Sequence, residues 1–434
     1  MFFLRTLFFD KLNCTNEMSL YMNLKKRFDC VYNVLLSERL KYIYEQTLYS
    51  VITFVYVFLV ANNLGPEQFG KFSSLYVLLM LFVVLESSFV LQYYTVISAK
   101  VSNSVRRTLM PGFVVFLPIL LSIGFYVYYN YDLFFSMMFM MFLIIRFYNE
   151  FNRRLLLISS MAIEQMFLNV VILCVLVASF VFFENIDLYG SFFILLMVSV
   201  ISFVYYFFLK KSRLGGGFRW RHVAVSIKMM FRYNGWMILV ALFAYMSNQL
   251  MPFILSLLSS SKDAGYFMVV LNYLGVSQVI LQALNVYYLK KLSVSLVNKS
   301  RAEAYSIANK VGNKMAVIMM IVLLPVVWFS DFIIESLYGD NFDVEFISVV
   351  YLYLYFVVMA KYQGVANYHK ILMKTELVFG SSVTALIAVY VVVLFVADIY
   401  GYVGTAFAVF GGSIVSLLSL KLLTYFDFRK SAYE

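Results

Sequence analysis

Polar side chains inside long apolar stretches are the groups of this sequence most able to do chemistry. Of its 434 residues, 63% are hydrophobic and 13% are charged. A carboxylate within such a stretch must face a cavity, find a partner or take up a proton. Glu86 lies near the middle of the apolar stretch 72–98 and is the candidate transport and coupling residue. The alternative is a protonated carboxyl bonded to the backbone or to Ser87 or Ser88.

Amide side chains form a second candidate group. Gln278, Gln282 and Asn285 are spaced i, i+4, i+7, so a helix places all three on one face. Asn248 and Gln249 lie in the preceding apolar stretch. Together they suit a wet substrate cavity that hydrogen-bonds sugar hydroxyls. The alternative is hydrogen bonding between helices of one bundle, which is a common use of amides.

Two cations, Arg146 and Lys361, lie about one to two turns inside the edges of their apolar stretches. Either could bind a phosphate or pyrophosphate, Arg146 through its bidentate fork. The alternative is that their charged ends reach the membrane surface. For Arg153 and Arg154 we expect only an influence on membrane topology.

The residues that usually mark catalysis or metal binding are sparse and scattered. The two histidines, His222 and His369, lie far apart, and the three cysteines form no ligand spacing. The motifs HExxH and GxSxG and the P-loop are missing from the sequence. We therefore expect no enzyme, no catalytic residue, no metal and no cofactor.

The elements that position these groups are predicted to be apolar helices, which makes the fold class all-α and polytopic. Dividing the apolar sequence into runs of roughly 17–25 residues predicts about twelve transmembrane spans. The predicted spans are 44–62, 72–98, 109–129, 133–151, 162–183, 190–209, 232–257, 266–289, 313–329, 346–362, 377–397 and 402–423.

Charge predicts how these spans are oriented. The net charge is +11, and nearly all Lys and Arg fall in segments that lie on one side if the spans alternate; Lys71 and Lys262 are the exceptions. By the positive-inside rule, that side is cytoplasmic and includes both termini. The basic balance therefore indicates a multi-pass protein of the bacterial plasma membrane and no nucleic-acid partner.

Internal repeats predict two lobes of six helices each around a central cavity. The turn ANNLGPEQFG (61–70) resembles SSKDAGYF (260–267), so that Gly70 corresponds to Gly265, and NIDLYGSF (185–192) resembles VADIYGYV (396–403). An even number of spans per half makes the repeat parallel. The predicted domains are a cytoplasmic amphipathic segment 1–42, an N-lobe 43–209, a basic and Gly-rich linker 210–231, a C-lobe 232–424 and a cytoplasmic tail 425–434.

The sequence resembles the polysaccharide-unit (O-antigen, Wzx-type) flippases of the multidrug/oligosaccharidyl-lipid/polysaccharide exporter superfamily. The resemblance rests on LGPEQFG at 64–70, DAGYF at 263–267, LYGDNF at 337–342 and GYVGTAFA at 401–408. It departs from the family at Asn62, where Arg is frequent, and in its longer amino-terminal segment.

The resemblance implies a flippase that moves undecaprenyl-pyrophosphate-linked oligosaccharide across the bacterial inner membrane by alternating access, for O-antigen, capsule or exopolysaccharide synthesis. The implied partners are this lipid-linked sugar, membrane lipid, H+ or Na+ as coupling ion, and a polysaccharide polymerase or glycosyltransferases. A cation-coupled multidrug or small-molecule antiporter is the alternative. A membrane glycosyltransferase or polymerase ranks third, because the predicted outer loops are short.

Overall fold

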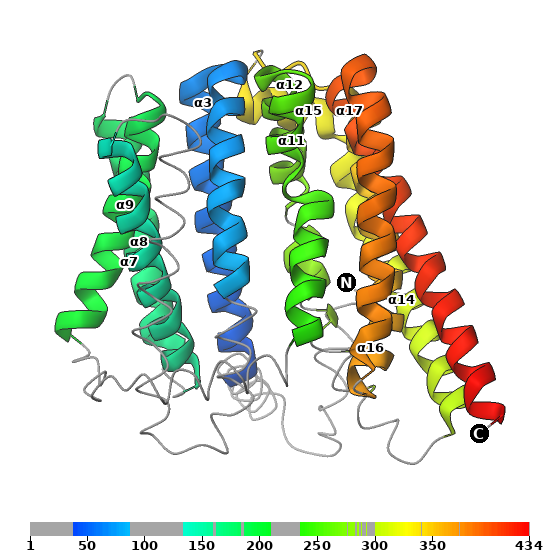
Figure 1. Ribbon diagram of the computed structural model, residues 1–434. Coiled ribbons are helices and arrows are strands. Elements are labelled where there is room, and N and C mark those ends of the chain that lie inside the picture. Colours follow the sequence, from blue (N-terminus) through cyan, green and yellow to red (C-terminus); the bar gives the residue numbers. More distant parts are fainter. Residues whose placement is uncertain are drawn as a thin grey trace, which may run out of the picture.

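The computed structural model describes residues 38–86, 133–158, 162–183, 186–209, 235–275, 277–282 and 300–433, except 340 and 373, with a few single positions between 284 and 292. This part of the chain is helical and contains no strand (Figure 1). The helices are α3 (Glu38–Glu86), α7 (Leu133–Ile158), α8 (Ala162–Phe182), α9 (Leu188–Val204), the π-helical η2 (Tyr205–Leu209), Gly235–Asn248, α11 (Met251–Leu258), α12 (Ser261–Tyr273), α14 (Arg301–Trp328), α15 (Ser330–Tyr338), α16 (Phe346–Ile371) and α17 (Thr375–Tyr433).

The two longest helices, α3 and α17, are helical hairpins. They contain 49 and 59 residues, and each has one non-helical glycine, Gly65 with φ 67° and Gly401 with φ 52°. The rings of Tyr56 and Tyr76 lie 6.0 Å apart, whereas a straight helix would separate these residues by about 30 Å. In Figure 1 the two arms of each hairpin run side by side and join at the top. The turn predicted at 61–70 is therefore confirmed.

Local sequence explains where several helices begin. Asp187 caps α9 by accepting a hydrogen bond from the Gly190 amide, and Ser260 caps α12 by accepting one from the Asp263 amide. Such caps satisfy amides that lack a partner in the first helical turn. The Asp-x-x-Gly pattern at 187–190 is thus an N-terminal capping signal. Pro66 follows Gly65 and begins the second arm of α3, where its missing amide hydrogen costs nothing.

Seven helices in the described ranges are long and apolar enough to cross a membrane, or up to eight if the bent pair Gly235–Asn248 and Met251–Leu258 is one span. The all-α, multi-pass fold is therefore confirmed. The predicted span 109–129, the segment 1–37 and the linker 210–231 lie outside the described residues. The total of twelve spans and the domain boundaries stay predictions.

Two predicted spans have different bounds in the structure. The predicted span 266–289 is interrupted, because α12 ends at Tyr273 and helical structure resumes only at 277. The predicted span 313–329 belongs to α14, which begins earlier, at Arg301, because Ser300 caps it and a polar first half continues the helix beyond the apolar stretch.

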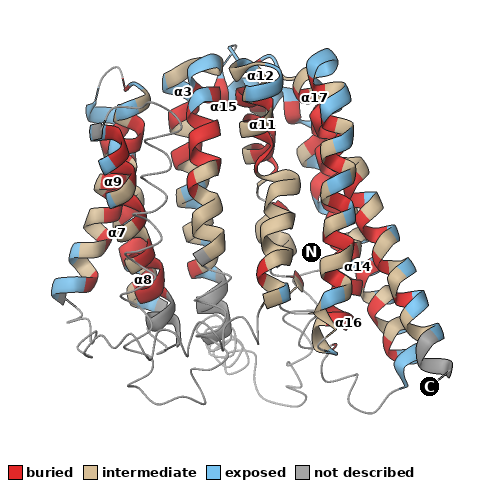
Figure 2. Ribbon diagram, in the orientation of Figure 1, coloured by how far each residue is buried: buried red, intermediate tan, exposed pale blue. Residues whose placement is uncertain are grey.

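The helices pack in two groups that meet at α3. The N-lobe consists of α3, α7, α8, α9 and η2, and the C-lobe consists of α11, α12, α14, α16 and α17. In Figure 1, α7, α8 and α9 lie on the left and α14, α16 and α17 on the right. Buried residues concentrate on the helix faces within and between these groups, whereas the turns at the top are exposed (Figure 2).

Candidate functional site

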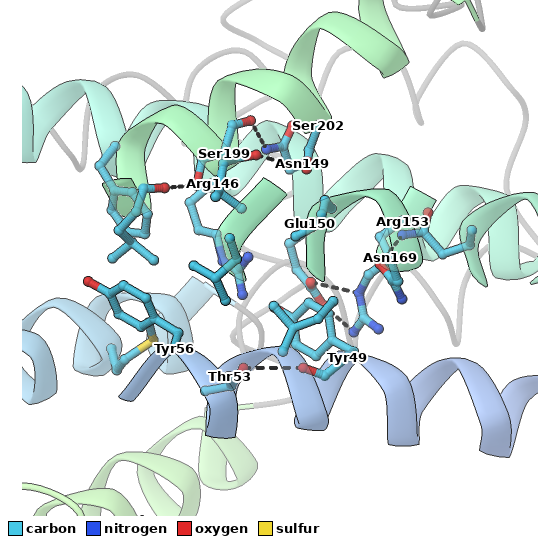
Figure 3. Close-up of a pocket in the computed structure, with 18 of the residues that line it drawn as sticks. Tyr49, Thr53, Tyr56, Arg146, Asn149, Glu150, Arg153, Asn169, Ser199 and Ser202 are labelled. Carbon is cyan, nitrogen blue, oxygen red and sulfur yellow. Dashed lines mark hydrogen bonds and ion pairs between the residues drawn. The ribbon is translucent and has the colours of Figure 1, made fainter. Parts of the chain in front are cut away.

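The N-lobe contains a polar cavity of about 70 Å³. That volume holds a few water molecules, so the cavity is too small for an oligosaccharide. Figure 3 shows Arg146, Asn149, Glu150 and Arg153 of α7 turned toward Tyr49 and Thr53 of α3. The other lining residues come from α3, α7, α8, α9 and η2 and are Ile52, Tyr56, Tyr76, Met80, Phe142, Gln165, Asn169, Ile172, Leu176, Leu195, Val198, Ser199, Ser202 and Tyr206.

Arg153 is the centre of a buried ion-pair cluster beside this cavity. Its Nη1 donates to Glu45 Oε1 at 2.8 Å and to Oε2 at 3.1 Å. Its Nε and Nη2 donate to Glu150 Oε2 and Oε1, each at 2.9 Å. All three side chains are buried, with Glu45 only 1% exposed. Arg153 therefore does more than influence topology, because one guanidinium holds two carboxylates from α3 and α7.

A chain of amides extends the cluster to the other N-lobe helices. Asn169 Nδ2 donates to Glu45 Oε1 at 3.3 Å, and Gln165 Nε2 donates to Asn169 Oδ1 at 3.0 Å. The hydroxyl of Tyr206 in η2 donates to Gln165 Oε1 at 2.6 Å. The chain joins α3, α7, α8 and η2, so the N-lobe is held together at this level by polar contacts.

Arg146 lies in the same cavity but has a different environment. Its guanidinium carbon stands 5.2 Å from the centre of the Tyr49 ring, on which Arg153 also stacks at 4.2 Å. Its Nε has no hydrogen-bond partner, and neither has the buried Asn149 Oδ1. The candidate phosphate ligand Arg146 thus lies inside the N-lobe, against an aromatic ring. Its role as a pyrophosphate contact stays a prediction.

Sequence reasoning missed Glu45 and Glu150 as members of this site. Glu150 and Arg153 are spaced i, i+3 on α7, a spacing that favours an ion pair. Glu45 lies inside the predicted span 44–62, where an acid is as costly as Glu86 would be. These two signals were available, but nothing local pairs Glu45 with a residue 108 positions later.

The two lobes meet where the matching turns of the repeat face each other. A Cβ atom added to Gly70 would lie 1.6 Å from the Ser261 carbonyl oxygen, and one added to Gly265 would lie 2.3 Å from the Pro66 carbonyl oxygen. Only glycine permits this approach of two backbones. The predicted close packing of Gly70 is confirmed, and its neighbour is the corresponding turn of the other lobe. We call this contact between residues 66–70 and 261–265 the glycine seam.

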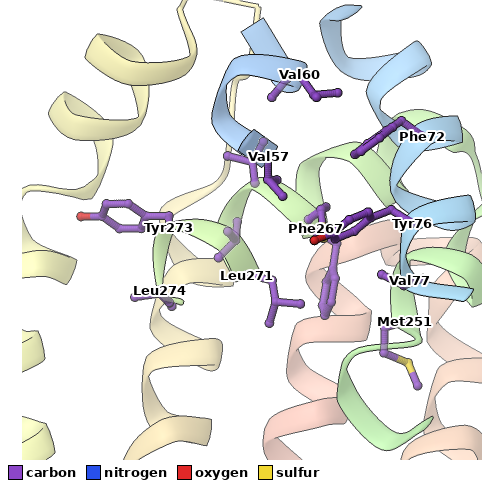
Figure 4. Close-up of a cluster of buried hydrophobic side chains, with 14 of the residues drawn as sticks. Val57, Val60, Phe72, Tyr76, Val77, Met251, Phe267, Leu271, Tyr273 and Leu274 are labelled. Atoms are coloured by element: carbon purple, nitrogen blue, oxygen red, sulfur yellow. The ribbon is translucent and has the colours of Figure 1, made fainter. Parts of the chain in front are cut away.

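Apolar packing and hydrogen bonds continue the glycine seam along α3. Val57, Val60, Phe72 and Tyr76 of α3 lie beside Phe267 and Leu271 of α12 in the cluster of Figure 4. Asn62 Nδ2 donates to the Leu337 carbonyl at 2.9 Å, and the Tyr245 hydroxyl donates to the Val77 carbonyl at 2.7 Å. These contacts hold the lobes together at the end where Gly65 turns the chain.

Most of the predicted amide group lies in the C-lobe, within different contacts. Asn248 Nδ2 donates to the Tyr355 hydroxyl at 2.8 Å, just before the 45° bend between Gly235–Asn248 and α11. Asn285 Oδ1 accepts a hydrogen bond from Asn367 Nδ2. Both amides thus make the interhelical bonds that were the alternative to a cavity. Gln249 and Gln278 are partly buried, and Gln282 is exposed.

The remaining two candidates have less structural detail. Glu86 is the last residue of α3, and its side chain lies outside the described part of the structure. Lys361 is partly buried on α16, where its carbonyl oxygen would lie 2.6 Å from a Cβ added to Gly312 of α14. The close packing of α14 on α16 positions Lys361. Its role and that of Glu86 stay predictions.

The fold is that of a two-lobed membrane transporter. The chain is similar to the lipid II flippase MurJ in its inward closed conformation, with a TM-score of 0.65, 13% identity, and coverage of 87% of this chain and 85% of that one. It is also similar to a eukaryotic MATE transporter, AtDTX14, with a TM-score of 0.54, 13% identity, and coverage of 90% and 96%. A MATE transporter from Vibrio cholerae gives 0.54, 12% identity, and coverage of 91% and 96%.

The sequence pattern of the family described as "Polysaccharide biosynthesis protein" matches residues 41–288, more than half of the chain. The chain therefore belongs to this family, and the resemblance seen in the sequence motifs is confirmed. No curated protein matches the chain at the sequence level. Family and fold together define a multi-pass membrane protein of the flippase and transporter class.

Proposed function

We propose that this protein moves a polyprenyl-pyrophosphate-linked oligosaccharide from the cytoplasmic to the outer leaflet of the bacterial plasma membrane. The observation that carries the proposal is the glycine seam, where the matching turns of the two lobes touch at one end of the molecule. Two lobes joined at one end can rock to open and close a path between them. The polysaccharide family favours a sugar-bearing lipid as cargo.

The charge distribution suggests which end of the molecule is closed. The positive-inside rule places the turns at 61–70 and 260–267 outside, so the glycine seam closes the path toward the outer side. A sugar-pyrophosphate head cannot cross hydrocarbon unaided, because each unpaired polar group costs several kcal/mol. We propose that Gln249, Gln278, Gln282 and Lys361 offer replacement partners while the lipid tail stays in the bilayer.

A cation-coupled antiporter is less well supported. Such a protein needs acids that are available to a cation inside a lobe, and both Glu45 and Glu150 are hydrogen-bonded to Arg153. Glu86 is the remaining candidate.

Lipid analysis of cells that lack the protein tests the proposal. We expect mass spectrometry to show build-up of a complete polyprenyl-linked repeat unit, together with loss of surface polysaccharide. Unchanged lipid-linked sugars with a new sensitivity to cationic drugs would contradict the flippase and favour the antiporter. An incomplete repeat unit would instead favour a glycosyltransferase.

Glu86→Gln tests whether transport is coupled to an ion gradient through this residue. If Glu86 carries the coupling proton or cation, the variant should lose at least about tenfold in export, equivalent to roughly 1.4 kcal/mol. The matched control is Glu67→Gln, which changes an exposed acid on the same hairpin. Export by Glu86→Gln that equals the wild type, with or without a proton or sodium gradient, would exclude Glu86 as the coupling residue.

A further inference from the structure

We propose that Arg153 is a tethered cation, filling a site in the N-lobe that would otherwise bind a monovalent alkali cation. The Glu45 and Glu150 carboxylates converge on this site from α3 and α7. With the guanidinium in place, the pair needs no mobile ion. Without it, the same oxygens should bind Na+ or K+.

The geometry supports this assignment because the guanidinium is fully engaged with the two carboxylates. Nη1 contacts both oxygens of Glu45, and Nε and Nη2 contact the two oxygens of Glu150. Carboxylate and amide oxygens are the ligands that hard cations prefer. The Asn149 Oδ1 lines the same cavity without a partner, and its residue is only 6% exposed. It is a further oxygen within the cavity for an incoming cation or its water.

Charge balance supports the same conclusion. The ionised groups at the cavity are Arg146 and Arg153 against Glu45 and Glu150, so the set is neutral. Removing the Arg153 guanidinium leaves one excess negative charge among buried side chains, and such a charge is costly unless a cation pairs with it. Arg146 is not placed to replace Arg153, because it stacks on the Tyr49 ring.

The consequence for transport rests on the proposed function. An N-lobe with a tethered cation keeps its polar cluster intact while the lobes rock, and it exchanges no ion during the cycle. Coupling to an ion gradient would then use another residue, such as Glu86.

Thermal unfolding of the purified full-length protein tests the site without reference to the substrate. The midpoint is measured in NaCl, KCl and choline chloride at equal ionic strength. The wild type should unfold at the same temperature in all three salts. Arg153→Gln should gain a saturating rise in Na+ or K+ over choline, on the order of 5 °C.

Three control variants separate the site from general charge effects. Arg153→Lys keeps a cation between the carboxylates and should show no rise. Arg153→Gln combined with Glu45→Gln removes the excess negative charge and should show no rise either. Arg146→Gln removes a guanidinium from the same cavity but leaves the Arg153 contacts, so it should behave as the wild type does.

Several results would overturn the proposal. One is a Na+- or K+-specific shift of the wild type that Glu45→Gln abolishes, because the site would then bind a mobile cation beside Arg153. Another is folded Arg153→Gln protein that responds equally to all three salts. A third is failure of Arg153→Gln to fold in NaCl and KCl while the double variant folds. None of these bears on the flippase, which the lipid analysis decides separately.

Discussion

Gly70→Ala is expected to prevent the lobes from closing at the glycine seam and to abolish polysaccharide export. The added Cβ would lie 1.6 Å from the Ser261 carbonyl oxygen, and a backbone atom cannot move aside as a side chain can. Overpacking of this kind costs about 1–3 kcal/mol. A cost of 2–3 kcal/mol would shift the ratio of closed to open protein roughly 30- to 150-fold toward the open form.

Cysteine labelling from outside the cell measures this shift. Ser74 is 7% exposed and its hydroxyl donates to the Pro252 carbonyl across the lobes, so Ser74→Cys should react slowly with a membrane-impermeant maleimide. Adding Gly70→Ala should speed the reaction by a similar factor, in a background without the native cysteines.

Gly411→Ala is the matched control, because a Cβ there would meet no atom within 4 Å. It should leave both labelling and export unchanged. Normal export by Gly70→Ala, with labelling as slow as in the control, would show that the glycine seam is not a gate.

Arg153→Ala should destabilise the protein far more than Lys71→Ala does. Both changes break an ion pair with a nearby Glu, but Arg153 and Glu45 are buried, with side chains 7% and 1% exposed, whereas Lys71 and Glu67 are 45% and 69% exposed. Leaving a buried charge without its partner costs about 3–5 kcal/mol. An exposed pair contributes about 0–1 kcal/mol.

The measurement is the unfolding midpoint of each purified variant in choline chloride, which supplies no alkali cation. The expected decrease is roughly 6–10 °C for Arg153→Ala and at most about 2 °C for Lys71→Ala. Equal decreases would mean that the Arg153 cluster contributes no more than a surface pair. The carboxylates would then have to be satisfied in another way.

Much of the fold could be predicted from the sequence, because helix formation in apolar sequence depends on local properties. Hydrophobic stretches long enough to span a bilayer predicted the helices 162–182 and 346–371 closely, and Gly65 with Pro66 predicted the first hairpin turn. Backbone hydrogen bonds within a helix join residues four apart, so nearby residues decide them. The bend before α11 and the interruption after Tyr273 were not predicted.

The candidate site depended on contacts between distant residues. The sequence identified Gly70 and Gly265 as equivalent, but only the tertiary structure brings their backbones together. It marked Arg153 as a topology signal, whereas packing of α3 on α7 and α8 surrounds Arg153 with Glu45 and Glu150 and bonds Asn169 to Glu45. Composition and spacing determined that this chain forms membrane helices with polar groups inside them. Which polar groups neutralise each other was decided by helix packing, because a buried charge is stabilised only by the partners that the fold places within hydrogen-bond distance.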